Sequence, residues 1–338
     1  MASLYITSIF GNSGKTMLSA GLGKIWQDNG RKVGYLKIST SAEPDSSSAK
    51  DSQFMRNLLG LQETVEVLCP IINDKESGGD AQQAYSSISK DKEIVIIEGL
   101  PLNVSAGIIE ALDAKVIVIH DYPNSFSTAI DEYKKLGVRL LGVVVNKVPR
   151  NKAVPIRNLA SESLSQSGIN LLGLVPEDRV LMTISIAELA EVLQGKILNS
   201  PDKSGELIES FMMGSSTFDR GPAYYGRKKN KAVFLWGERP GYRKAALAAL
   251  PQGALQTSTK CIVISANGIP VPAVAQKAEE QQVPIISAPG TITDMVTALE
   301  DAMGRLKFIQ EQKMPHLLET LRSNLDFKTL SDGVGLAV

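Results

Sequence analysis

The first residues that could do chemistry are Gly14, Lys15 and Thr16, which lie just after an apolar run near the start of the chain. The run at residues 4–9 has the composition of a buried strand, and an amphipathic helical pattern begins at Thr16. A strand, a loop ending in Gly-Lys-Thr and a helix, in this order, are typical of a phosphate-binding loop. Backbone N–H groups and a helix N-terminus together attract an anion. The sequence therefore predicts a bound nucleoside triphosphate, either ATP or another nucleotide.

Each residue of this loop has an expected role. Gly14 lets the backbone approach the phosphates, Lys15 reaches the β and γ oxygens, and the Thr16 hydroxyl binds Mg²⁺. The full pattern has a further glycine where this chain has Ile9, so one position of easy positive φ is lost. A chance Gly-Lys-Thr on a surface loop is the alternative, which the flanking strand and helix disfavour. The predicted phosphate-binding residues are Gly11, Asn12, Ser13, Gly14, Lys15 and Thr16.

Two acidic residues are expected to complete a magnesium site with the hydroxyl of Thr16. Glu98 ends the apolar run at residues 94–97, so its carboxylate would emerge at the carboxyl edge of a parallel sheet, where ligands bind. Asp51 follows a polar loop and starts a helical pattern, so it is either a metal ligand or the cap of that helix. Carboxylate and hydroxyl oxygens suit a hard cation. The predicted metal ligands are thus Thr16 and Glu98, with Asp51 as the third candidate.

Lys37 is expected to lie at the end of the second buried strand, directly after Gly34-Tyr35-Leu36. A buried ammonium is costly unless it meets an anion, so Lys37 is a candidate to bind the γ-phosphate or a substrate carboxylate. A surface lysine that extends its stem to reach water is the alternative. If the protein is an enzyme, Lys15 and Lys37 are the predicted catalytic residues.

Polar residues after two later strands are candidates to bind the nucleobase. Asn146 follows the apolar run at residues 140–145, and its amide can donate and accept hydrogen bonds at once. Pro176, Glu177 and Asp178 follow the next run and would close the other side of the base. Ordinary turn chemistry is the alternative for Asn146 and for this group. His120 ends another strand without a second histidine or cysteine nearby, which indicates a structural role.

The composition limits the partners and the compartment. The 338 residues carry 36 basic and 36 acidic side chains, so no single-sign field favours a nucleic acid. The basic run Arg227-Lys228-Lys229 is interpreted as a solvated loop. Cys69 and Cys261 lie far apart in the sequence and are expected to be reduced thiols. We find no secretory leader and no apolar stretch of roughly eighteen residues, so we expect a cytoplasmic protein without a membrane span.

Apolar runs alternate with helical patterns through the first part of the chain. The runs are continuously apolar, as in parallel strands that are covered on both faces. The pattern predicts an α/β fold, a doubly wound parallel sheet of the P-loop NTPase type. The predicted strands are residues 4–9, 32–38, 94–97, 116–119, 140–145 and 171–175, and the predicted helices are residues 16–27, 52–59, 125–136 and 153–167.

The chain is expected to contain two domains and a tail. A polar, turn-rich stretch at residues 199–205 is the expected linker between a first domain at residues 1–198 and a smaller α/β domain at 206–308. Residues 309–338 contain a helical pattern and an apolar tail that is either disordered or docked. The tail favours a homo-oligomer or a protein partner. In the second domain the predicted strands are 232–236, 261–265 and 283–287, and the predicted helices are 243–250, 271–281 and 292–308.

Taken together, these motifs resemble a known pair of domains. The first part is similar to the dethiobiotin-synthetase-like N-terminal domain of long bacterial phosphate acetyltransferases, and the second resembles the DRTGG domain that follows it there. The resemblance covers roughly residues 3–305 and lies in the order and spacing of the motifs. It rests on the phosphate loop, the Gly-Tyr-Leu-Lys at 34–37, residues 51–61, Glu98-Gly99-Leu100-Pro101, Asn146-Lys147, residues 171–178, 236–243 and 290–293.

The resemblance implies that Asp51 is a metal ligand and that both domains serve in regulation and assembly, as they do in the long enzymes. Two departures stand out. Ile38 follows Lys37 where the family usually has proline, and Glu238-Arg239-Pro240 replaces the glycine-rich centre of the second domain. The chain stops soon after that domain, so no acetyltransferase activity is expected.

Three functions remain open on the sequence. The leading interpretation is a Mg²⁺-dependent, ATP-binding regulatory or assembly protein. The first alternative is an ATP-dependent synthetase that phosphorylates a carboxylate or carbamate, with Lys15, Lys37 and the metal stabilising the transferred group. The second is a non-catalytic scaffold with a decayed phosphate loop, for which the missing glycine at Ile9 is the support.

Overall fold

The computed structural model describes residues 1–11, 13–39, 46–72, 78–214, 221–236, 252–270, 272–303 and 310–336. The chain forms two compact units. The first contains Met1–Leu181 together with Lys307–Val338, and the second contains Met182–Leu306. The second unit is therefore inserted into the sequence of the first.

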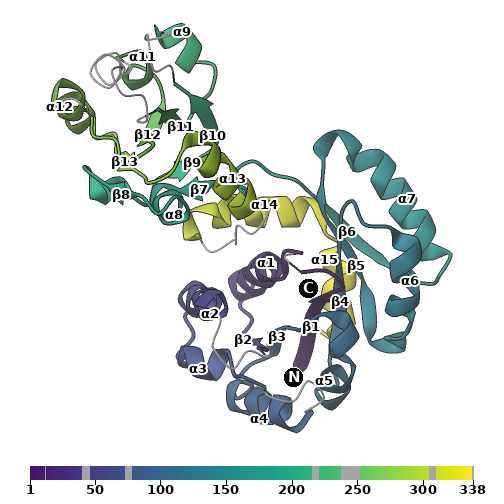
Figure 1. Cartoon of the computed structure of the whole chain (residues 1–338). Helices are drawn as coiled ribbons and strands as arrows, with labels where there is room; N and C mark the ends of the chain where they lie inside the picture. The colour runs from purple at the N-terminus through teal and green to yellow at the C-terminus, as the bar shows by residue number, and fades with distance from the viewer. Residues whose placement is uncertain are drawn as a thin grey trace. The chain divides into compact units, whose positions relative to one another are not determined.

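The first unit is built on a six-stranded sheet with the strand order β2-β3-β1-β4-β5-β6. Every neighbouring pair is parallel, and the central strands are almost wholly buried because helices cover both faces (Figure 1). The continuous apolar runs of the sequence thus form a doubly wound parallel sheet, as predicted. The strands are β1 (Ala2–Ser8), β2 (Val33–Lys37), β3 (Ile94–Glu98), β4 (Lys115–Asp121), β5 (Leu140–Val148) and β6 (Leu171–Pro176).

The helices that follow these strands differ in how closely their observed bounds match the predicted ones. Helix α1 (Lys15–Asp28) and α7 (Ala153–Ser165) lie close to the predicted bounds, whereas α2 (Ser46–Leu59) begins several residues earlier than predicted. Helix α6 (Phe126–Lys134) matches the pattern that follows Ser125. The remaining helices of this part are α3 (Val65–Leu68), α4 (Gly78–Ile88) and α5 (Ala106–Ala111).

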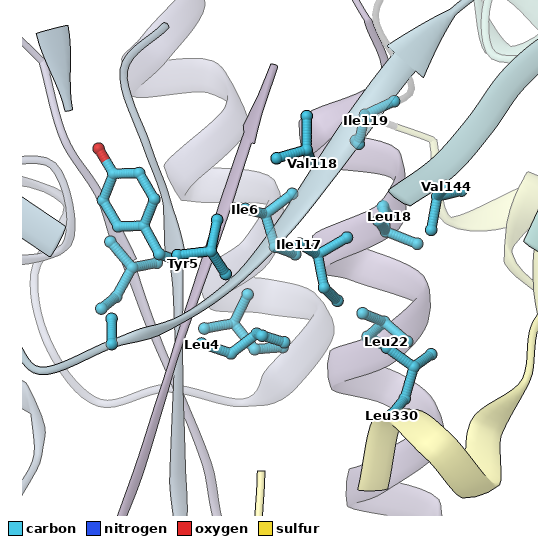
Figure 2. Close-up of a cluster of buried hydrophobic side chains, with 14 of the residues drawn as sticks. Leu4, Tyr5, Ile6, Leu18, Leu22, Ile117, Val118, Ile119, Val144 and Leu330 are labelled. Atoms are coloured by element: carbon cyan, nitrogen blue, oxygen red, sulfur yellow. The ribbon is translucent and has the colours of Figure 1, made fainter. Parts of the chain in front are cut away.

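The C-terminal segment docks on its own first unit. Helices α14 (Met314–Asn324) and α15 (Phe327–Gly333), drawn in yellow, lie against α1 and the strands β5 and β6 (Figure 1). A Cβ at Gly21 of α1 would collide with Leu321, and the backbone N–H of Asp326 donates to the Leu172 carbonyl at 2.8 Å. Figure 2 shows Leu330 of α15 beside Leu22 within the apolar core. Of the two fates expected for the tail, docking is the one observed, and its apolar residues are used within this unit.

The second unit has a five-stranded sheet with the order β10-β11-β12-β13-β8. Strands β10 to β13 are parallel, and β8 is an antiparallel edge strand. Strands β7 and β9 form a separate antiparallel pair. The strands are β7 (Ile184–Ser185), β8 (Lys196–Ile197), β9 (Leu207–Ile208), β10 (Ser210–Met213), β11 (Lys231–Leu235), β12 (Thr259–Ile264) and β13 (Ile285–Ser287). The helices are α8 (Ile186–Val192), α9 (Gly221–Tyr225), α11 (Gln252–Leu255), α12 (Pro272–Glu280) and α13 (Ile292–Met303), with a short 3-10 helix η4 (Pro201–Lys203).

The division between the units lies at Leu181 and Met182, upstream of the expected linker at residues 199–205. The side chain of Asn199 ties that stretch to the second unit, since its Nδ2 donates to the Val283 carbonyl at 3.0 Å. The predicted helix at 243–250 lies outside the described residues. Within the described ranges, no helix has the length and apolar character needed to cross a bilayer.

Candidate functional site

The loop between β1 and α1 has the backbone geometry that a phosphate-binding loop needs. Gly14 is the N-cap of α1 and has φ of 96° and ψ of 25°, a left-handed conformation that glycine adopts without strain. Asn146, at the end of β5, packs so closely on this residue that a Cβ at Gly14 would collide with its Nδ2. The same Nδ2 donates to the Ser13 carbonyl at 2.8 Å. The loop is therefore held from the neighbouring part of the sheet.

The remaining loop residues lie around this turn. Lys15 Nζ donates to Ser8 Oγ at 3.3 Å, and that hydroxyl donates to the Phe10 carbonyl at 2.6 Å. Gly11 is exposed, and Asn12 lies outside the described residues. Ser13 is buried, and among the described residues its hydroxyl has no hydrogen-bond partner. A buried hydroxyl in this position is a ready donor for a phosphate oxygen.

The three predicted metal ligands converge beside the first turn of α1. Thr16 Oγ1 lies 2.9 Å from Glu98 Oε1 and 3.5 Å from Asp51 Oδ2. Glu98 ends β3, the strand next to β1, so parallel pairing brings it to the phosphate loop. Asp51 lies inside α2, well past its first residue, and is 1% exposed. The helix-cap alternative for Asp51 is therefore wrong, because the helix begins earlier and directs this carboxylate into the unit.

Lys37 lies between the same two carboxylates. Its Nζ is 2.6 Å from Asp51 Oδ2 and 2.8 Å from Glu98 Oε1, and the residue is only 8% exposed, which excludes a surface lysine reaching water. Burial alone would lower the pKa of Lys37, but the two carboxylates raise that pKa above its ordinary value. Burial would raise the pKa of Glu98, but the Lys37 ammonium and hydrogen bonds from Tyr35 and Thr16 hold it below its ordinary value. Both groups are therefore charged at neutral pH.

Tyr35 is a residue of this cluster that the sequence reasoning missed. Its hydroxyl donates to Glu98 Oε2 at 2.8 Å, and its side chain is fully buried. This bond fixes the carboxylate so that Oε1 faces Thr16 and Lys37. The signal was present, because Tyr35 and Lys37 are two residues apart on one strand and so point to the same face.

The donor set fits Mg²⁺. One hydroxyl and two carboxylates are all-oxygen ligands, and Mg²⁺ is usually held by one or two carboxylates with water and substrate phosphates completing the shell. Across the described part of the chain, no group of three or more His, Cys, Asp or Glu side chains could hold a metal. A cation here would thus depend on Thr16 and a ligand as well as the acids. It would also compete with Lys37, which uses the same two oxygens, Asp51 Oδ2 and Glu98 Oε1.

The residues predicted to bind a nucleobase lie at the carboxyl ends of β5 and β6, which are neighbours in the sheet. Asn146 is 5% exposed and uses its amide to hold Ser13. Pro176 is half-buried and Glu177 is exposed, with its backbone N–H donating to the Val148 carbonyl at 2.8 Å. Their role in binding a base stays a prediction.

Two residues near these strands have structural partners. Asp178 is paired with Arg150 and with His316 Nε2, the latter at 2.8 Å, so it joins the C-terminal segment to the end of β6. His120 Nδ1 lies 2.8 Å from the Tyr133 hydroxyl, its Nε2 lies 3.0 Å from the Asn124 carbonyl, and its ring stacks on Phe126. The expected structural role of His120 agrees with these contacts.

A parallel sheet whose first strand leads through a glycine-capped loop into a helix with Lys15 and Thr16 defines a P-loop NTPase-type domain. Comparison with known families places it more narrowly. A family model described as an AAA domain matches residues 2–185, more than half of the chain, and a model of the DRTGG domain matches residues 188–302. The chain belongs to this AAA domain family, with a DRTGG domain after it, which confirms the resemblance stated from the sequence.

Two relatives with similar sequences agree with this assignment. An ATP-dependent dethiobiotin synthetase from Methanococcus vannielii is 26% identical over 204 residues, which cover 52% of this chain and 94% of that protein. A phosphate acetyltransferase from Nitrosomonas europaea is 22% identical over 244 residues, which cover 64% of this chain but only 35% of that protein. Among solved structures, the signal recognition particle 54 kDa protein from Aeropyrum pernix, in complex with GDP, has a TM-score of 0.40 at 13% identity and covers 52% of this chain and 41% of that one.

Proposed function

We propose that the first unit binds ATP or another nucleotide together with Mg²⁺, and that the protein acts in regulation or assembly without transferring acetyl groups. The phosphates would lie on the backbone N–H groups of residues 11–16, with Lys15 on the β and γ oxygens. Thr16, Asp51 and Glu98 would hold the metal. The positive charge of the bound metal would offset the negative charge of the triphosphate. The second unit would sense a ligand or mediate association, and the protein would act in the cytoplasm.

One observation carries the nucleotide proposal most directly. Gly14 caps α1 in the left-handed conformation, and Lys15 and Thr16 begin the helix. The first N–H groups of a helix have no partner inside it, and the helix dipole gives that end about half a positive charge. This is the arrangement that a phosphate group requires. It also speaks against the decayed-scaffold alternative, since the turn keeps its geometry although Ile9 replaces a glycine.

Titration calorimetry with ATP and GTP tests the proposal. We expect saturable heat with one of them in the presence of Mg²⁺, and we expect Lys15→Ala to weaken binding with and without metal. Lys15 contributes a charge-assisted contact to the phosphates, and such a contact is typically worth about 1.5–3 kcal/mol, or roughly tenfold or more in affinity. No heat from either nucleotide, with the protein folded and Mg²⁺ present, would remove the proposal and favour a scaffold.

A second variant pair separates metal ligands from structural acids. Glu98→Gln keeps the shape and removes the charge, so Mg²⁺-dependent nucleotide affinity should fall by roughly tenfold or more. Asp51→Asn should act in the same direction, because an amide is a poorer ligand for a hard cation. Glu110→Gln changes an exposed acid of the same unit and is the matched control. Calorimetry at high and low Mg²⁺ decides, and equal binding by all four proteins would show that neither acid holds the metal.

The position of Lys37 favours one further candidate function, a synthetase in which ATP phosphorylates a carboxylate or carbamate. The Lys37 ammonium lies at the carboxyl edge of the sheet, next to the proposed metal ligands, and would stabilise charge on a transferred phosphoryl group. The similarity to a dethiobiotin synthetase over most of that protein supports the same idea. Phosphate release that rises when a panel of small carboxylates and amines is added would favour the enzyme. Nucleotide binding with little turnover would favour the regulator.

A further inference from the structure

The second unit contains a polar pocket at the amino ends of its parallel strands. Its volume is about 340 Å³, at the low end of the range for small-molecule sites. Thr257 and Ser258 precede β12, Lys260 lies on it, and Lys203 ends the short helix η4. Gln281 and Gln282, which follow α12, line the pocket as well. The residues on its wall are therefore mainly hydrogen-bonding and basic.

Positive charge exceeds negative charge at the rim. Lys203 and Lys260 share one carboxylate, that of Glu206. Lys260 Nζ lies 2.6 Å from Glu206 Oε2, and Lys203 Nζ lies 3.7 Å from Glu206 Oε1. All three side chains are about one third exposed. Two ammonium groups with one shared carboxylate leave the rim able to accept a further anion.

A third lysine lies directly behind the pocket wall. Lys231, the first residue of β11, is 0% exposed. Its Nζ donates to Thr257 Oγ1 at 2.9 Å and to the Ser258 carbonyl at 3.0 Å, and both acceptors belong to the wall. In the part of the chain that the structure describes, no carboxylate forms an ion pair with it. Burial lowers its pKa, as expected for an ammonium without a counter-charge.

We propose that this pocket binds a small organic anion with a carboxylate or phosphate group. Lys203 and Lys260 would contact the anionic group, and Lys231 would add positive potential from behind Thr257. The amides of Gln281 and Gln282 would bond to polar groups on the rest of the ligand. The C-terminal end of α12 adds about half a negative charge, which opposes anion binding. This charge is small against the net positive charge of three ammonium groups and one carboxylate. The inference rests on the ligand-sensing role proposed for the second unit and gives it a ligand class.

Calorimetric titration of the full chain with citrate and with inorganic phosphate tests the site. All proteins carry Lys15→Ala, so that the phosphate loop contributes as little as possible. We expect at least one probe to bind, and we expect Lys203→Met combined with Lys260→Met to weaken that binding by roughly tenfold or more. Lys229→Met removes an exposed lysine of the same unit that does not line the pocket, and it should leave the affinity unchanged.

Glu206→Gln is the sharpest variant because its effect has the opposite sign. Removing this carboxylate frees both lysines, so the bound probe should bind roughly threefold tighter or more. An unfolded protein cannot give this result, and thermal melting checks the lysine variants. Binding of neither probe, unchanged binding in the double lysine variant, or weaker binding with Glu206→Gln would each overturn the proposal. Nucleotide titration of the protein with Lys15 intact is independent, so loss of the proposed ATP function would leave this result standing.

Discussion

Replacing Lys37 with methionine should destabilise the first unit by about 3–5 kcal/mol when no divalent cation is present, because two buried carboxylates would then face each other without a counter-charge. Asp51 is 1% exposed and Glu98 is 4% exposed, so bulk water compensates little for the lost ammonium. Mg²⁺ should restore much of this loss, since a cation in that place would use the same oxygens. Urea denaturation with and without Mg²⁺ measures both effects.

The same variant should bind a divalent cation more tightly than the parent in the absence of nucleotide. In the parent, Lys37 occupies Asp51 Oδ2 and Glu98 Oε1, and a metal must displace it. Mn²⁺ binding followed by electron paramagnetic resonance reports this directly. Adding Glu98→Gln to Lys37→Met removes one of the two negative charges that repel each other. The double variant should therefore recover part of the stability without metal. Equal destabilisation with and without Mg²⁺ would contradict the idea that Lys37 takes the place of a cation.

Leu321→Ala should destabilise the first unit by about 2–5 kcal/mol, the range found when a buried leucine is shortened. Leu321 is 0% exposed and packs over Gly21, at a point of α1 where no side chain would fit beneath it. The truncation therefore leaves a cavity between α14 and the helix that begins at the phosphate loop. Urea denaturation, followed by a spectroscopic signal that reports on the first unit, measures the loss of stability.

Glu319→Ala is the matched control, because Glu319 is an exposed residue of the same helix. Its effect should stay within about 0.5 kcal/mol, as is usual for surface substitutions. If Leu321→Ala behaves like this control, the C-terminal segment does not contribute to the core of the first unit. A large loss for Leu321→Ala alone would establish that the unit is discontinuous in sequence.

Much of the first unit could be predicted because its signals are local. Strands buried on both faces show as continuous apolar runs, and the parallel arrangement then brings their carboxyl ends to one edge. From this arrangement the sequence predicts that Thr16, Lys37 and Glu98 lie together at one edge of the sheet. The phosphate loop was recognisable for the same reason, since its motif lies between a strand and a helix that the periodicity identifies.

The remaining features depend on contacts that leave no local pattern. The position of Asp51 inside α2 was missed because Ser46-Ser47-Ser48, the first residues of that helix, are poor helix formers. The pairing of His316 with Asp178 joins residues far apart in the chain. The stretch at 199–205 has the composition of a linker, yet the Asn199 side chain donates to the Val283 carbonyl and accepts from the backbone N–H of Ile285 in β13. Composition alone does not distinguish a free linker from a polar stretch that is held by such hydrogen bonds.

The docking of the C-terminal helices also bears on how the protein is made. Ribosomes synthesise a chain from its N-terminus to its C-terminus, and domains generally fold in the order in which they are synthesised. Here Leu22 of α1 has its apolar contact Leu330 on a helix that is synthesised only after the whole inserted unit. The nascent first unit must therefore wait with part of its core open to solvent, while the second unit, continuous in sequence, can fold earlier. Completion of the nucleotide-binding unit becomes a late, long-range step of biosynthesis, at which chaperones can act.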